Sequence, residues 1–285
     1  MYKTDLHLHT TYSDGNLSPK ELIDLCYKNG LRNISITDHD STQGIQESID
    51  YSNKYSDLQI IPGIELNTDF KIAEIHILGF YINYKDKNLQ KTLSNFRYDR
   101  ENRAYRIVEK LKEFDIDISW DRVLEISNKG SIGRPHIAKA MVEKGYIKYP
   151  KEAFEKYLGY GKIGYIAKTK FTPKQSIELI IKYGGVPVIA HPIYAIQQNS
   201  KNPIEELENI LLELKNVGLK GVEVYYNDYT KEQIKYLLNL TDKLNLIPCG
   251  GSDYHASGNP NEIIPGTIGP PIECLIELQK IRDSI

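Results

Sequence analysis

Short runs of β-branched and other apolar residues recur along this chain, and helix signals separate several of them. The runs do not alternate polar with apolar residues, which is typical of parallel strands buried on both faces. We expect seven strands, at Thr4–His9, Asn33–Thr37, Gln59–Glu65, Ala73–Phe80, Val186–Ala190, Gly221–Tyr225 and Leu246–Gly250. Strands that alternate with helices predict an α/β fold, and seven of them favour a closed or nearly closed barrel.

Three helices between these strands begin with the same signal. A capping box, in which a Ser or Thr is followed three residues later by Glu or Gln, occurs at Ser18–Glu21, Thr172–Gln175 and Thr230–Gln233. Glycines end two of these helices, at Gly30 and at 184–185. The helix boundaries therefore support the strand–helix alternation.

The alternation stops between about residues 85 and 170, where no segment resembles a strand. Helical patterns fill this region, at Asn88–Phe114, Trp120–Ser127, after Gly133 and at Lys151–Leu158. We predict a barrel made of residues 1–84 and 171–285. Residues 85–170 are expected to form a helical insertion subdomain over one end of the barrel.

Composition excludes several classes of protein. A net charge of −2 argues against a generally basic nucleic-acid-binding protein, and no apolar run approaches the ~20 residues of a membrane span. The N-terminus lacks the apolar stretch of a signal peptide. Cys26, Cys249 and Cys274 are too scattered for a zinc pair or a disulfide framework, so we expect a cytoplasmic protein.

Two histidines on the first strand carry the strongest chemical signal. His7 and His9 are two residues apart, so their side chains point to the same face of the strand, near its C-terminal end. Asp14 follows in a turn within reach of the same end. Active sites of barrels lie at this end of the strands, and a packed histidine pair would need buried hydrogen bonds. We therefore predict that these side chains bind metal.

Further histidines and carboxylates occur in or just after other predicted strands. The nine candidate metal ligands are His7, His9, Asp14, His39, Glu65, His76, His191, Asp253 and His255. A barrel brings the strand ends together, and nine ligands suit two or three ions rather than one. Ions that cluster ~3.5–4 Å apart suit phosphate-ester hydrolysis, because they activate water and neutralise phosphate oxygens.

The segments DLHLHTTYSDG, TDHD, PGIE, HILGF, AHP and GSDYH resemble, in this order, the motifs of the polymerase and histidinol phosphatase (PHP) family of metal-dependent phosphoesterases. This resemblance extends over nearly the whole chain. It implies a distorted barrel of seven strands, three divalent metal ions and a small phosphorylated substrate, a nucleotide or short RNA or DNA. We expect no association with a membrane and no stable protein partner.

The resemblance also implies how the ligands divide among the ions. One ion would take His7, His9, Glu65 and Asp253; a second would share Glu65 and add His76 and His191; a third would take Asp14, His39 and His255. Some branches of the family carry a histidine where this chain has Asp14. An oxygen ligand there favours manganese or iron over zinc, and we expect manganese.

The insertion carries a second motif, Gly133-Arg134-Pro135-His136. Arg134 and His136 at a helix start suit a phosphate group. The same two residues could instead be a surface arginine and a histidine that caps the helix. This motif resembles the branch that contains nucleoside 3′,5′-bisphosphate phosphatases and 5′-to-3′ exoribonucleases. Lys162 is a further candidate cation. Asp40 and His136 are both candidates for the general acid, and the sequence does not decide between them.

One motif is better explained by a loop. Residues 159–164 match G-x-G-x-x-G, but a helical pattern precedes them, where a dinucleotide site needs a strand. Tyrosines are abundant and mostly suit packing, although Tyr12, Tyr165 or Tyr254 could stack on a base.

Four functions remain open. A phosphoesterase that acts on small nucleotides or oligonucleotides is the leading hypothesis, with Glu65 as the carboxylate shared by two ions. A histidinol-phosphate phosphatase is the alternative enzyme, and the insertion motif argues against it. A proofreading or non-catalytic accessory domain would not need all nine ligands. A hydrolase of carbon–nitrogen bonds would need a bridging lysine, and no lysine follows a strand in a suitable position.

Overall fold

The structure is a computed structural model that describes residues 3–284, except 71–72, 129, 168–170 and 198–202. Its elements along the chain are β1 (Thr4–Leu8), α1 (Pro19–Lys28), β2 (Asn33–Ile36), α2 (Ile45–Ser52), β3 (Gln59–Phe70), β4 (Ala73–Phe80), α3 (Lys87–Lys112), α4 (Trp120–Ser127), α5 (Arg134–Glu143), α6 (Pro150–Ala153), the π-helical turn η1 (Phe154–Leu158), α7 (Pro173–Lys182), β5 (Val186–Ala190), α8 (Pro192–Gln197), α9 (Pro203–Asn216), β6 (Gly221–Tyr226), α10 (Lys231–Leu244), β7 (Ile247–Gly251) and α11 (Ile272–Asp283).

The strands form one seven-stranded sheet in the order β1 to β7. The sheet nearly closes, because the segment that follows β7 bonds back to β1: the Asp253 N–H donates to the His7 carbonyl at 2.9 Å, and the His9 N–H donates to the Tyr254 carbonyl at 3.1 Å. The predicted seven-stranded barrel is therefore confirmed. Its closure places the end of β1 beside the residues that follow β7.

The direction of one strand differs from the prediction. β4 runs antiparallel to both β3 and β5, whereas the remaining neighbours are parallel. The chain between β3 and β4 is too short for the helical crossover that parallel neighbours need, so the two strands form a hairpin. The hairpin also extends β3 to Phe70, so Glu65 lies inside a strand and not at its end.

The predicted helix starts agree with the structure. α1, α7 and α10 each begin with a capping box, in which the side chain of Ser18, Thr172 or Thr230 accepts a backbone hydrogen bond. Gly30 follows α1 with a φ of +84°, a conformation that glycine adopts without strain. In the described part of the chain, no helix is both long and apolar enough to cross a bilayer.

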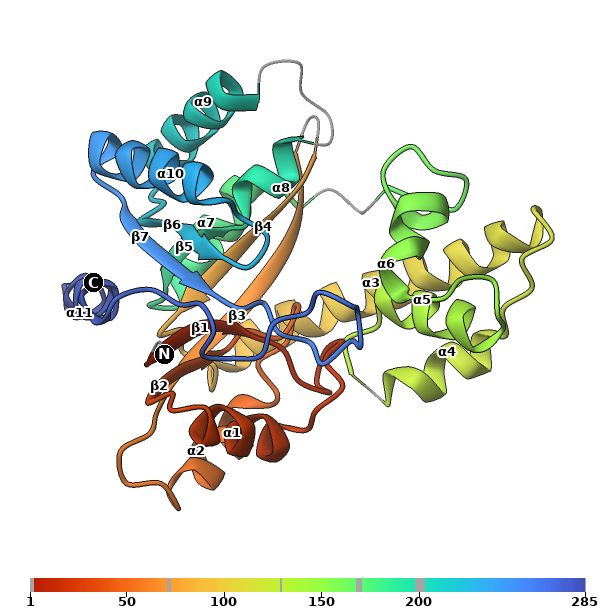
Figure 1. The fold of residues 1–285 in the computed structure, drawn as a ribbon, viewed down its shortest axis with the longest axis horizontal. Coiled ribbons are helices and arrows are strands. Elements are labelled where there is room, and N and C mark those ends of the chain that lie inside the picture. Colours follow the sequence, from red (N-terminus) through yellow and green to blue (C-terminus); the bar gives the residue numbers. More distant parts are fainter. Residues whose placement is uncertain (1–2, 71–72, 129, 168–170, 198–202, 285) are drawn as a thin grey trace.

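The helices α3–α6 lie together on one side of the barrel, and α11 lies on the opposite side (Figure 1). Buried residues between Ala104 and Leu158 form an apolar cluster separate from those of the barrel. α3 joins the two parts: Leu89 and Leu93 in its first turns pack into the barrel cluster, and Val108 and Leu111 near its end pack into the helical cluster. This shared helix fixes where the helical segment stands relative to the strand ends.

The C-terminal helix packs against an apolar cluster that several strands of the barrel share. Cys274 on α11 and Cys249 on β7 are both buried, with their sulfur atoms 3.4 Å apart. Cys26 is also buried, and all three thiols are free. Burial raises the pKa of the Cys249 thiol well above its usual range, so this cysteine behaves as an apolar core residue.

Candidate metal centre

β1 and the turn after it place three of the predicted ligands. His7 and His9 are buried and point to the same side of β1, and Asp14 lies in the following turn. The buried Asp38 carboxylate fixes this turn by accepting hydrogen bonds from the Thr10 N–H at 2.8 Å and the Ser13 hydroxyl at 2.6 Å. Asp14 is therefore held close to the end of β1.

The first group of side chains surrounds one oxygen of Glu65. The Nε2 atoms of His7 and His9 lie 3.4 and 3.3 Å from Glu65 Oε2. The same two nitrogens lie 3.2 and 3.1 Å from Oδ1 of Asp253, which follows β7. These four side chains are the set that the resemblance assigns to a single ion.

The second group surrounds the other oxygen of Glu65. Oε1 lies 2.8 Å from Nδ1 of His76 on β4 and 3.2 Å from Nε2 of His191, which follows β5. The antiparallel pairing of β3 with β4 brings His76 beside Glu65, so the hairpin builds this group. Glu65 thus faces a different set of imidazoles with each of its oxygens.

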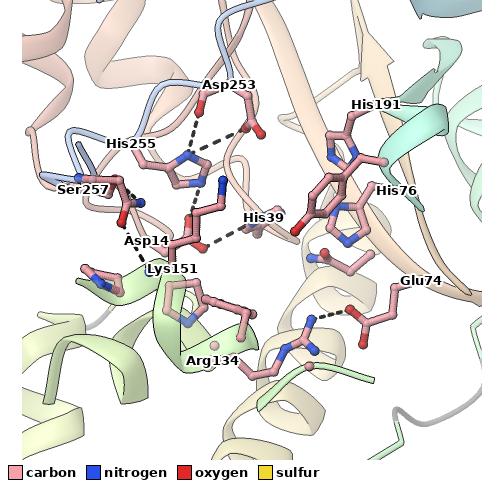
Figure 2. A pocket seen from close by; sticks show the side chains of 18 of the residues that line it. Asp14, His39, Glu74, His76, Arg134, Lys151, His191, Asp253, His255 and Ser257 are labelled. Carbon is pink, nitrogen blue, oxygen red and sulfur yellow. Dashed lines mark hydrogen bonds and ion pairs between the residues drawn. The ribbon is translucent and has the colours of Figure 1, made fainter. Parts of the chain in front are cut away.

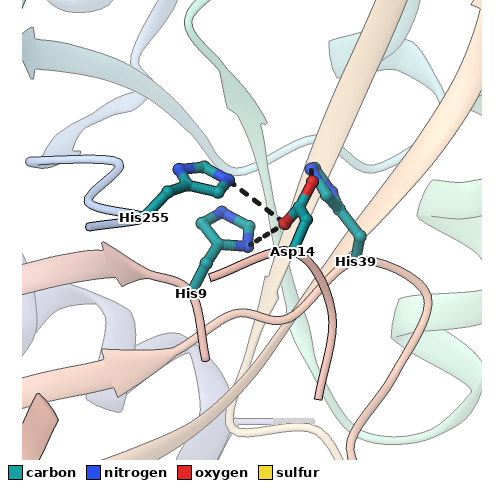
Figure 3. A group of neighbouring side chains, drawn as sticks. All are labelled: His9, Asp14, His39 and His255. Atoms are coloured by element: carbon teal, nitrogen blue, oxygen red, sulfur yellow. Dashed lines mark ion pairs between the residues drawn. The ribbon is translucent and has the colours of Figure 1, made fainter. Parts of the chain in front are cut away.

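The third group surrounds Asp14 (Figure 3). Nε2 of His255 lies 3.2 Å from Oδ1, and Nε2 of His39 lies 3.5 Å from Oδ2. Two contacts go beyond the sequence analysis: His9 turns its Nδ1 toward Asp14 at 3.8 Å, and His39 turns its Nδ1 toward Glu65 at 2.8 Å. All nine predicted ligands therefore lie in one connected cluster.

The cluster has the properties of a site for cations. Several of its buried polar atoms lack a hydrogen-bond partner in the described part of the chain, including Nε2 of His7 and His9, Oε2 of Glu65 and both carboxylate oxygens of Asp14. Such atoms are costly unless a ligand satisfies them. Two ligands of one ion at about 2.1 Å lie roughly 3.0–3.4 Å apart, close to the separations seen here. The residues present therefore fit bound divalent ions.

The charges of the cluster are strongly coupled. Burial alone would raise the pKa of Glu65, but the neighbouring histidines hold it well below its usual range. Burial would lower the pKa of His9, but Asp253 and Glu65 raise it to about 10. In this cluster cations and protons compete for the same imidazole nitrogens, so a metal ion must displace protons when it binds.

A cavity of about 680 Å³ opens beside the cluster. One wall contains Asp14 and the exposed edges of the histidines, and the opposite wall comes mostly from the helical segment (Figure 2). Glu65 also lines the cavity. That second wall is cationic: its basic side chains are Arg100, Arg103, Arg134, Lys139, Lys151 and Lys162. The arrangement suits an anion that contacts both walls.

Arg134 begins α5 and lines the cavity. Its guanidinium forms an ion pair with Glu74 on β4 and donates to the Leu158 carbonyl at 3.2 Å. Arg103, which sequence reasoning missed, approaches the other oxygen of Glu74 at 3.1 Å. Lys162 is exposed and lies in the loop 159–164, which follows η1 instead of a strand. Its side chain is among those that line the cavity.

His136 does not lie where the sequence analysis expected. Its ring is buried, Nδ1 accepts a hydrogen bond from the Gly133 N–H at 3.0 Å, and Nε2 donates to the Ser13 carbonyl at 3.1 Å. His136 is not among the residues that line the cavity. Both nitrogens are used by the backbone, so the ring joins α5 to the turn that carries Asp14 and is not placed to bind phosphate or donate a proton to a leaving group.

Asp40 also differs from the expectation of a general acid. Its carboxylate pairs with Arg100 at 3.0 Å and accepts from the Asn67 side chain at 3.2 Å. It does not line the cavity. Its carboxylate oxygens are thus occupied by partners within the fold, so Asp40 fits a structural role that ties α3 to the strand ends.

Two further residues support the cluster, and sequence reasoning missed both. Glu223 on β6 is fully buried behind His7 and His191. The Tyr226 hydroxyl donates to Oδ2 of Asp253 at 3.1 Å. A single acidic residue inside the apolar run Gly221–Tyr225 was the signal that could have drawn attention to Glu223.

Comparisons with known proteins agree with this geometry. The sequence matches the PHP domain over residues 5–215. A 5′-3′ exoribonuclease of Haemophilus influenzae is 30% identical over 89% of this chain and 90% of its own length. A 3′,5′-nucleoside bisphosphate phosphatase of Chromobacterium violaceum is 28% identical over 96% of this chain and 94% of its own. A crystal structure from Bifidobacterium adolescentis, described as a metal-dependent phosphoesterase, has a TM-score of 0.85 at 30% identity and covers 98% of this chain and 96% of that chain.

The buried ring of His136 predicts a dependence of stability on pH. Burial lowers its pKa from 6.5 to about 4, so between these values a proton binds the unfolded chain but not the folded one. Above pH 6.5 neither state binds that proton, and stability is unaffected. Relative to His136→Gln, the free energy of unfolding of the wild type should fall by up to about 3 kcal/mol between pH 6.5 and 4.

Denaturant titrations of both proteins at several pH values measure this difference. Gln cannot take up the proton, but its amide can still accept from Gly133 and donate to Ser13. A difference between the two proteins that stays constant from pH 7 to pH 4 would show that the ring is not held neutral.

Proposed function

The chain belongs to the PHP domain family, and we propose that it is a hydrolase that cleaves phosphate esters of small nucleotides or short oligonucleotides with divalent metal ions. The observation that carries this proposal is the buried carboxylate of Glu65, which faces histidines with both oxygens at the edge of a cavity with a cationic far wall. Such a pairing of a metal-ligand cluster with basic side chains suits a phosphate group.

We propose three ions per chain, held by the three groups described above. The first group would supply His7, His9, Glu65 and Asp253, the second Glu65, His76 and His191, and the third Asp14, His39 and His255. The oxygen ligand Asp14 favours manganese, with iron and zinc as alternatives. The sharing of Glu65 between two groups supports its role as the carboxylate common to two ions.

The bound ions would activate water and offset negative charge on the phosphate that is cleaved. The chain's own residues hold the ligands in place and bind the substrate. Glu65 balances the charge of the ligand cluster, and the Tyr226 hydroxyl holds Asp253 in place by a hydrogen bond to its outer oxygen. Arg134 and Lys162 on the opposite wall would bind another part of the substrate.

The cavity argues for a small or terminal nucleotide. A volume of about 680 Å³ lies in the range of pockets that enclose one small ligand. Arg103 and Arg134 meet at Glu74, so this part of the wall can accept a second phosphate that shares the guanidinium groups with that carboxylate. A nucleotide with two phosphates, or the phosphorylated end of a short RNA, would place one phosphate at each wall.

The alternative functions have less support. The relatives named above act on nucleotides or RNA by their names, and this does not favour histidinol phosphate as the substrate. An accessory domain without catalysis would not need a complete ligand cluster beside a cavity.

A substrate panel tests the proposal directly. The manganese-loaded protein is incubated with adenosine 3′,5′-bisphosphate, with short 5′-phosphorylated RNA and with histidinol phosphate, and released phosphate and mononucleotides are measured. We expect the highest kcat/KM on one of the two nucleotide substrates. Turnover of histidinol phosphate alone, or of none of the three, would contradict the proposed function.

Loss of the shared carboxylate should affect both metal content and turnover. Glu65→Gln removes one negative charge and one acceptor oxygen from the position between the first two groups. We expect at least one ion fewer per chain by elemental analysis, and a fall in kcat/KM of at least about 100-fold. Glu47→Gln, at a partly exposed position on α2, is the control. A Glu65→Gln protein with full metal content would show that the carboxylate is not shared.

Loss of the guanidinium at the opposite wall should weaken the binding of the substrate and leave the binding of metal unchanged. Arg134→Ala should lower kcat/KM by about 10–100-fold, the range of a lost charged hydrogen bond, and leave metal content unchanged. Arg122→Ala is the matched control, because that arginine forms exposed ion pairs on α4 away from the cavity. Equal kcat/KM for Arg134→Ala and Arg122→Ala on every phosphate ester would rule out the binding role.

A further inference from the structure

Glu223 is a buried acid that no step described so far requires. It lies on β6 between Val222 and Val224, with none of its surface exposed. In the described part of the chain it forms no ion pair with a lysine or an arginine. A carboxylate at such a position is costly unless its oxygens receive strong hydrogen bonds.

Both oxygens of Glu223 receive such bonds from the ligand cluster. Oε1 lies 3.0 Å from Nδ1 of His7, and Oε2 accepts the backbone N–H of His191 at 2.8 Å. His7 belongs to the first group of ligands and His191 to the second. One carboxylate therefore contacts both groups from behind, on the side away from the cavity.

The contact with His7 determines which of its nitrogens can bind a metal. A carboxylate only accepts hydrogen bonds, so Nδ1 of His7 must carry the proton. The neutral ring then has its lone pair on Nε2, the atom that faces Glu65 and Asp253. Carboxylates that orient a ligand histidine in this way raise its basicity and fix its ring.

The contact with His191 supports a backbone conformation that is unfavourable by itself. His191 has a φ of +27°, which is uncommon for a residue with a Cβ atom. The bond from its N–H to Glu223 holds this turn at the end of β5. The turn aims the imidazole back at Oε1 of Glu65.

We propose that Glu223 is a positioning residue that sets the tautomer of His7 and the backbone of His191, so that it couples the first two metal groups. This inference rests on the proposed function, because it takes His7 and His191 to bind metal ions. Glu223 is not itself a ligand, because both its oxygens are occupied on the far side of the rings.

The isosteric substitution Glu223→Gln separates this role from simple packing. An amide accepts with its oxygen and donates with its nitrogen, whereas the two partners, His7 Nδ1–H and His191 N–H, both donate. Whichever way the amide is turned, two donors face each other, unless His7 moves its proton to Nε2 and loses its metal-binding lone pair. The shape of the side chain stays the same.

Metal affinity is the first measurement. In competition with a chelator, Glu223→Gln should bind the ions of the first two groups about 10–100-fold less tightly than the wild type. The visible absorption of the cobalt-loaded protein should change with it, and excess manganese should restore part of the lost turnover. Glu213→Gln, at an exposed position on α9, is the control and should match the wild type.

The wild-type protein supplies a second measurement that does not depend on how the variant folds. In nitrogen-15 NMR spectra of the zinc-loaded protein, His7 should carry its proton on Nδ1 and bind zinc through Nε2. Binding through Nδ1 would overturn the proposal, and so would Glu223→Gln with wild-type affinity and an unchanged cobalt spectrum. A wild-type protein that binds no divalent ion would instead overturn the proposed function together with this inference.

Discussion

A single buried carboxylate organises the centre of this protein. Glu65 is inaccessible to solvent, and its two oxygens lie within 3.4 Å of imidazole nitrogens from five histidines: His7, His9, His39, His76 and His191. An ionised acid in that position is stable only when opposite charges or hydrogen-bond donors surround it. Those partners come from β1, from β4 and from the ends of β2 and β5, so these strands must assemble around β3 before the carboxylate is satisfied. The fold and the cluster therefore depend on each other.

The helical segment is tied to the cluster by its contacts with one turn. The Ser131 N–H donates to the Tyr12 carbonyl at 3.0 Å, His136 donates to the carbonyl of Ser13, and Lys139 donates to the carbonyl of Asp14 at 2.9 Å. Burial lowers the pKa of Lys139, while the nearby charges of Asp14 and Glu262 oppose that change. These three contacts hold the start of α5, and with it Arg134, at a fixed place relative to Asp14. These contacts join the two walls of the cavity. The distance between the walls is therefore fixed before a substrate binds to both of them.

Much of this arrangement could be predicted from local patterns, and the exceptions have physical causes. The i, i+2 spacing of His7 and His9 reports a shared strand face, and the capping boxes at Ser18 and Thr172 mark helix starts, because both signals depend on the local backbone alone. The β3–β4 hairpin was missed because apolar runs read the same in parallel and antiparallel strands that are buried on both faces. His136 and Asp40 were predicted to act on the substrate because a sequence does not show whether an imidazole or a carboxylate already forms hydrogen bonds or ion pairs within the fold. The roles of the nine ligands as holders of particular ions stay predictions, although the fold brings all nine together.

Charge balance links the cluster to the kind of substrate that it can receive. Four carboxylates contact the ligand imidazoles: Asp14, Glu65, Asp253 and Glu223. With neutral histidines these carboxylates carry four negative charges, which two divalent ions would cancel without attracting an anion. A third divalent ion would leave two positive charges at the floor of the cavity, which match the two negative charges of a phosphate monoester near neutral pH. The third group around Asp14 is the part of the cluster nearest the turn held by α5. The proposed third ion would therefore supply the attraction for phosphate at the point where the two walls are joined.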